Sequence, residues 1–82
     1  MDMNVFKLEL DCSRCDGVGM ALVAAPDFEA AKEEYIRNGE CSDDVATGLI
    51  VFTSQSEEPI LGLHYDGGEE VLCDCFCFNQ EI

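Results

Sequence analysis

The stretch Leu72-Cys73-Asp74-Cys75-Phe76-Cys77-Phe78 lies close to the C-terminus and places a cysteine at every second position. In an extended strand, successive side chains point to opposite faces, so the three cysteines would share one face. The leucine, the aspartate and both phenylalanines would share the other face. Both faces would then be mostly apolar, which predicts a central strand buried on two sides, and we expect the fold to be organised around it.

The residues before this stretch predict further strands. Asp66-Gly67-Gly68 predicts a tight hairpin turn, because glycine adopts positive φ without steric cost. We expect this turn to join a strand over residues 60–65 to the cysteine strand over residues 69–78. Residues 48–53 are rich in β-branched and apolar side chains and predict another strand, and residues 54–59 form a loop by composition.

The N-terminal residues predict a β-hairpin. Residues 5–10 alternate strictly: Phe6, Leu8 and Leu10 share one face, and Lys7, Glu9 and Asp11 share the other. This alternation predicts a half-buried strand. Residues 12–17 are rich in turn formers and should reverse the chain. Residues 18–25 return as a second strand with Val18, Met20 and Leu22 on one face and small residues on the other.

One helix is predicted after Pro26. Asp27 is a good N-cap, because its carboxylate accepts from the free amides of the first turn. An apolar stripe recurs at helical spacing and consists of Phe28, Ala31, Tyr35 and Ile36. Glu33 and Arg37 are spaced for an i,i+4 ion pair. Asn38-Gly39 predicts a left-handed C-terminal stop, and residues 39–47 are expected as a polar, acidic connection.

The predicted order is therefore β-β-α-β-β-β. The fold class is α+β: a single domain over residues 1–82, with an antiparallel sheet of four to five strands and one helix packed on one face. A chain of 82 residues supports one modest hydrophobic core and not two.

The charge balance restricts the partners. Eighteen acidic and four basic residues give a net charge of −14, spread along the chain. Without a basic patch, direct binding of nucleic acid or of an anionic membrane is excluded, and no apolar run approaches the roughly 18 residues of a membrane span. A basic protein partner, or mimicry of a nucleic acid, is electrostatically favoured. The N-terminus shows neither a basic nor an apolar targeting region, so we expect a cytoplasmic protein with reduced thiols.

The segment Cys12-Ser13-Arg14-Cys15-Asp16-Gly17-Val18-Gly19 fits the pattern C-x-x-C-x-G-x-G. This spacing lets two thiolates chelate one ion, and the following glycine allows a close backbone approach. These eight residues, about a tenth of the chain, resemble one repeat of the zinc-binding region of DnaJ-type chaperones, and also a zinc-ribbon knuckle. The resemblance implies zinc bound by thiolates. Those chaperones carry several such repeats, whereas this chain has one, and no chaperone activity is carried over.

A complete zinc site needs more thiolates, and the candidate set is Cys12, Cys15, Cys73 and Cys75, with Cys41 as a further candidate ligand. The sulfurs around one zinc lie within about 4 Å of each other. Same-face residues of a regular strand are about 6.5–7 Å apart, so the C-terminal cysteines chelate poorly unless the strand bends. Two alternatives stay open: buried core thiols without a cofactor, and up to three disulfides in an oxidising compartment.

No catalytic constellation is visible. His64 is the only histidine and has no identifiable nucleophile or carboxylate partner, so it is interpreted as structural. We therefore expect not an enzyme but a small acidic binding or regulatory module with a protein partner. A zinc-stabilised domain and a thiol enzyme are the competing classes. Homodimerisation through an edge strand or the C-terminal hairpin is compatible with the pattern.

Overall fold

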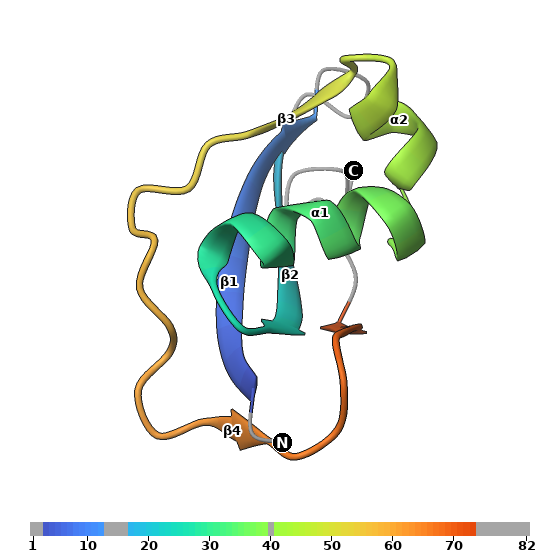
Figure 1. The fold of residues 1–82 in the computed structure, drawn as a ribbon. Coiled ribbons are helices and arrows are strands. Elements are labelled where there is room, and N and C mark those ends of the chain that lie inside the picture. The colour runs from blue at the N-terminus through green and yellow to red at the C-terminus, as the bar shows by residue number, and fades with distance from the viewer. Residues whose placement is uncertain (1–2, 13–16, 40, 74–82) are drawn as a thin grey trace.

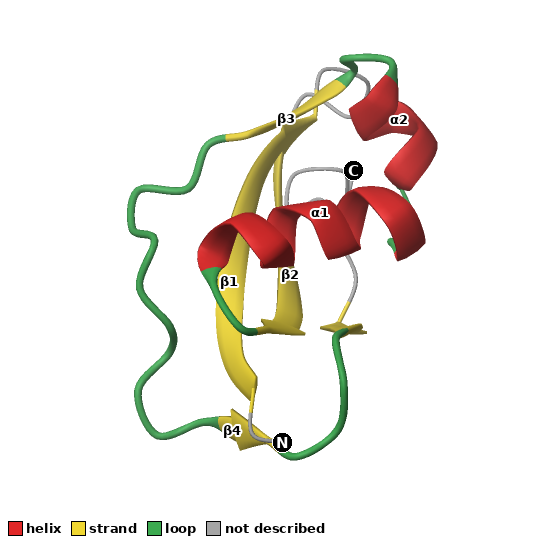
Figure 2. Cartoon of the chain, in the orientation of Figure 1, coloured by secondary structure: helices red, strands yellow, loops and turns green. Residues whose placement is uncertain are grey.

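The structure is a computed structural model that describes residues 3–12, 17–39 and 41–73, with the backbone alone at Cys12, Gly17, Val18 and Cys73. It contains a five-stranded antiparallel sheet and two helices (Figures 1 and 2). The predicted α+β class is confirmed. The strand order is β3-β1-β2-β5, and β4 pairs with β1.

The predicted N-terminal hairpin is confirmed. Strand β1 covers Met3–Cys12 and strand β2 covers Gly17–Ala25. They pair antiparallel over nine residue pairs, from Asn4 opposite Ala25 to Cys12 opposite Gly17. Strand β1 has β2 on one edge and both β3 and β4 on the other, so it is the centre of the sheet.

Helix α1, Phe28–Asn38, lies across one face of the β1–β2 hairpin (Figure 1). The Asp27 carboxylate caps it as predicted, accepting from the backbone N–H of Ala30 at 2.8 Å. The predicted left-handed stop is wrong: Gly39 has extended dihedrals, φ −73° and ψ 159°. Glycine is required there for close approach, because a Cβ would lie 2.7 Å from the ring of Tyr35.

The polar side chains of α1 also pair differently from the prediction. Arg37 pairs with Glu34 at 3.0 Å rather than with Glu33. Asn38 donates a second hydrogen bond to the same carboxylate, so both oxygens of Glu34 are bound. These two partners explain how a carboxylate can be buried on the helix, since a buried charge needs pairing.

The hydrophobic core lies between α1 and the sheet. Its buried members are Phe6, Leu8, Leu10, Ala21, Val23, Ala25, Phe28, Ala31, Tyr35 and Ile50. The predicted inward face of β1 is confirmed. Strand β2 presents its small-residue face to the helix, while Met20 and Leu22 are half-buried on the opposite face. Small side chains on β2 let the helix approach the sheet closely.

The connection over residues 39–47 contains a helix that the sequence pattern did not predict. Helix α2 covers Ser42–Ala46, and acidic Asp43 and Asp44 lie in its first turn, where they complement the helix dipole. Val45 packs against the core. A segment of five residues is too short to show helical periodicity, which explains the omission.

Three short strands complete the sheet: β3 Ile50–Phe52, β4 His64–Tyr65 and β5 Glu70–Cys73. The predicted 66–68 hairpin is wrong, because β4 pairs with β1 whereas β5 pairs with β2. The connection between them therefore crosses from one edge of the hairpin to the other (Figure 2). Among the described glycines, the positive φ values belong to Gly48 and Gly62 and not to this turn.

Within the described residues, β5 lies at an end of the sheet rather than at its centre. It pairs with β2 at Leu22, Val23 and Ala24, with a register shift between the first two. The predicted central position of the cysteine strand is thus wrong for its described part. Residues 74–78 of that predicted strand lie outside the described residues.

Candidate functional site

Strands β3 and β4 share the same edge of β1. Phe52 of β3 lies opposite Leu10, and His64 of β4 lies opposite Asn4. From Phe52 to His64 the chain covers twelve residues, whereas the facing part of β1, from Leu10 to Asn4, covers six. At about 3.3 Å per residue, the loop between β3 and β4 is about twice as long as a paired strand would need. The loop over residues 53–63 therefore runs beside β1 but bows away from it (Figure 1).

The loop is attached to β1 at two points. Near β3, the Thr53 N–H donates to the Glu9 carbonyl at 2.7 Å. The Glu9 N–H donates to the Ser54 hydroxyl at 2.9 Å, so a side chain takes the place of the next backbone acceptor. Near β4, the Ile60 N–H donates to the Val5 carbonyl at 2.8 Å. The loop is therefore hydrogen-bonded to the edge of β1 at Glu9 and at Val5.

Between these two attachment points, the backbone of Lys7 forms no hydrogen bond to any residue that the structure describes. Alternate residues of an antiparallel strand bond to opposite neighbours. Since Val5 and Glu9 bond to the loop side, the N–H and C=O of Lys7 also point to that side. Within residues 3–12, 17–39 and 41–73, neither group has a hydrogen-bond partner. Lys7 is exposed, so water can solvate both groups.

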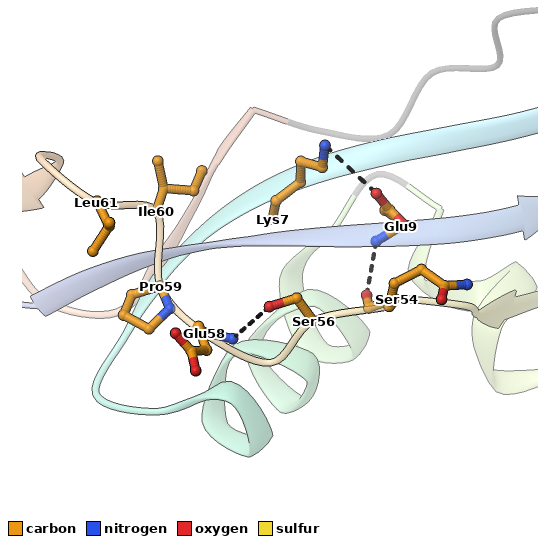
Figure 3. A pocket seen from close by; sticks show the side chains of 9 residues that line it. Lys7, Glu9, Ser54, Ser56, Glu58, Pro59, Ile60 and Leu61 are labelled. Carbon is orange, nitrogen blue, oxygen red and sulfur yellow. Dashed lines mark hydrogen bonds and ion pairs between the residues drawn. The ribbon is translucent and has the colours of Figure 1, made fainter.

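A cavity of about 410 Å³ lies at this opening. It is lined by Lys7, Glu9, Ser54, Gln55, Ser56, Glu58, Pro59, Ile60 and Leu61. Figure 3 shows these side chains coming from β1 on one side and from the loop on the other. Two carboxylates and one ammonium line it, and the Lys7 ammonium lies 3.5 Å from the Glu9 carboxylate. The lining is therefore polar near β3, and near β4 it is apolar apart from Glu58.

A turn places Leu61 at the outer end of this cavity. The Leu63 N–H donates to the Ile60 carbonyl at 3.4 Å, and Gly62 has φ +85°. Glycine at the third position of a four-residue turn is typical of type II, which requires positive φ there. Leu61 is 91% exposed as a result. Residues 60–65 were predicted as a strand, and the glycine within that apolar run is the signal that could have indicated the turn.

The cysteines predicted to bind zinc lie mostly outside the described residues. Cys15 and Cys75 are outside them, and only the backbone of Cys12 and Cys73 is described. Cys12 is the last residue of β1. Cys73 pairs with Leu22 of β2, and Leu22 pairs with Lys7 of β1, so the two cysteines are five residues apart along β1. This register separates the two backbones by at least about 17 Å. The zinc site stays a prediction.

Other predicted residues occupy separate places. Cys41 immediately precedes α2 and packs half-buried against the core. His64 is exposed on β4. Among side chains that the structure describes, no three histidines, cysteines or carboxylates come close enough to hold a metal ion. No helix in the described part of the chain is long and apolar enough to cross a membrane.

The connection between β4 and β5 is fixed by one short hydrogen bond. The Tyr65 hydroxyl donates to the Glu70 carboxylate at 2.6 Å. This hydrogen bond raises the pKa of Tyr65, with smaller contributions from desolvation and from the negative charge of Glu70. A Cβ on Gly67 would lie 2.6 Å from the Tyr65 ring, so the connection passes directly against it.

Comparison of the chain with protein-family models, curated proteins and solved structures found no match. The arrangement itself offers three chemical features at one place: an open backbone donor and acceptor, an acidic lining and an exposed leucine. Sequence reasoning singled out none of these, because each depends on how the loop is attached to β1.

Proposed function

We propose that this domain is a small acidic binding module that recognises a basic protein. The observation that carries the proposal is the exposure of Leu61 at 91% beside acidic side chains on the loop. Exposed apolar side chains surrounded by polar ones are typical of protein interaction sites. Leu63, the last residue of the loop, and Val51 of β3 are also exposed. Among the described large apolar side chains, Leu61 is by far the most exposed.

The charge supports a basic partner. At −14, the domain attracts cations over its whole surface, which raises association rates with basic proteins at low salt. Glu57 and Glu58 lie on the loop itself, and Glu9 faces it from β1. A nucleic-acid-binding protein is one such partner, and mimicry of a nucleic acid would be a special case of the same recognition.

Selection from a displayed random peptide library tests this proposal. We expect immobilised domain to enrich peptides that combine lysine or arginine with large apolar residues. Binding of the enriched peptides should weaken as salt rises, because exposed charges are screened over about 10 Å at 0.1 M salt. Enrichment of neutral or acidic peptides, or of none, would contradict the proposal.

A further inference from the structure

We propose that the cavity between β1 and the 53–63 loop is a slot for one short extended segment of the basic partner, whose backbone pairs with Lys7. This inference rests on the proposed function and names its site. Extended peptides commonly bind by adding a strand to a sheet edge, where main-chain hydrogen bonds supply affinity and side chains supply specificity.

The geometry limits the length of the segment. The loop closes the ladder at Glu9 and at Val5, so the open edge of β1 extends over about 13 Å. A strand of three to four residues spans this distance at about 3.4 Å per residue. One of them would donate to the Lys7 carbonyl and accept from the Lys7 N–H. The remaining contacts must come from the loop.

The loop has the length to accommodate a segment. The chain from Phe52 to His64 covers twelve residues, whereas a paired strand would need six. Longer loops cost little additional closure entropy. Its attachment near β3 includes the hydrogen bond that the Ser54 hydroxyl accepts from the Glu9 N–H. A single side-chain bond is easier to rearrange than a continuous backbone ladder. The loop can therefore move outward without separating β3 or β4 from β1.

The lining indicates which side chains fit. In Figure 3, Lys7, Glu9 and Ile60 lie on the same side of β1. Directly opposed side chains in an antiparallel pair share a face, and like charges there are unfavourable. The residue opposite Lys7 should therefore be apolar and contact Ile60. A lysine or arginine two positions away would share this face and reach Glu9, whose exposed pair with Lys7 contributes little and is easily exchanged.

The test uses a capped hexapeptide with one central valine, a lysine two positions to either side of it and threonine elsewhere, titrated into the full chain with ¹⁵N-labelled backbone. We expect saturable amide shift changes confined to residues 5–9 and 54–61. Leu61→Ser and Glu9→Gln should each weaken binding by about fivefold or more, as expected for loss of an apolar or charge-assisted contact. N-methylation of the central valine removes a main-chain donor and should weaken binding by about tenfold.

Matched variants distinguish the slot from general attraction to an acidic protein. Ile36→Ser removes an equally large apolar side chain that is 41% exposed on α1, and Glu33→Gln removes the same charge there. Both should leave affinity within about twofold of the parent, because surface substitutions away from a site have small effects. Equal weakening by Leu61→Ser and Ile36→Ser would overturn the slot.

Other outcomes separate this inference from the proposed function. Enrichment of basic peptides by the library, with shift changes elsewhere on the domain, would overturn the slot and leave the function standing. A library that enriches nothing would overturn both. A dimer seen by sedimentation, with amide shift changes at residues 5–9 on dilution, would also overturn the slot, because a second copy would then occupy it.

Discussion

Leu8 and Leu61 are the same residue type in opposite environments, so their substitution by alanine tests where the core ends. Leu8 of β1 is fully buried in the core between the sheet and α1, whereas Leu61 is 91% exposed. Leu8→Ala removes the equivalent of three buried carbons at about 0.8 kcal/mol each, and the cavity left behind adds to this loss. We expect Leu8→Ala to lower the free energy of unfolding by about 3–4 kcal/mol, and Leu61→Ala by less than about 0.5 kcal/mol.

The assay is urea unfolding followed by circular dichroism. A domain of 82 residues is stable by about 4–12 kcal/mol, so Leu8→Ala should remove about a quarter or more of the total. The melting temperature should fall by roughly 15 °C or more, with no change in the urea m-value. A loss below about 1 kcal/mol for Leu8→Ala, or an equal loss for Leu61→Ala, would refute this assignment of the core.

Three further predictions concern other parts of the fold. Glu70→Gln should lower the pKa of Tyr65 toward its ordinary value near 10, seen by NMR titration of the ring carbons. Since the folded-state pKa of Tyr65 is raised, this hydrogen bond stabilises the fold below about pH 10, and its contribution is lost as pH rises through the folded pKa. An unchanged Tyr65 pKa in the Glu70→Gln variant would argue against the bond. Gly39→Ala should destabilise by about 1–3 kcal/mol through its clash with Tyr35, whereas Gly68→Ala, with nothing within 4 Å, should be neutral or stabilising; equal effects would rule out the clash. Chelator should leave the melting temperature and the native mass unchanged, because aliphatic and aromatic side chains form the buried cluster; loss of a zinc adduct together with unfolding would instead establish the zinc-stabilised domain.

The parts of the fold with strong local signals were predictable from the sequence. Alternation in β1 identified its buried face, and Asp27 identified the start of α1. In both cases neighbouring residues in the chain determine the structure. The glycine at residue 39 was also identified as the helix end, although its role is close contact with Tyr35 rather than a left-handed conformation.

The pairing of the last strands was not predictable in the same way. Asp66-Gly67-Gly68 has the composition of a hairpin turn, yet β4 and β5 pair with different strands. The outcome depends on competition between distant partners for the two edges of the β1–β2 hairpin, and local sequence does not report that competition. The site followed the same rule, since the open backbone of Lys7 arises only from the excess length of the loop.

Hydrogen exchange at the Lys7 amide is the sharpest test of the slot, because the slot requires this group to be without a hydrogen bond in the free protein and bonded in the complex. In the free domain, Lys7 should exchange within about tenfold of an unstructured chain, while Phe6 and Leu8, which face β2, should exchange at least about a thousandfold more slowly. Saturation with the lysine–valine hexapeptide should slow exchange at Lys7 by about tenfold or more. A Lys7 amide as protected as Phe6 in the free protein, or unchanged by the peptide, would show that the edge of β1 at Lys7 does not receive a peptide strand.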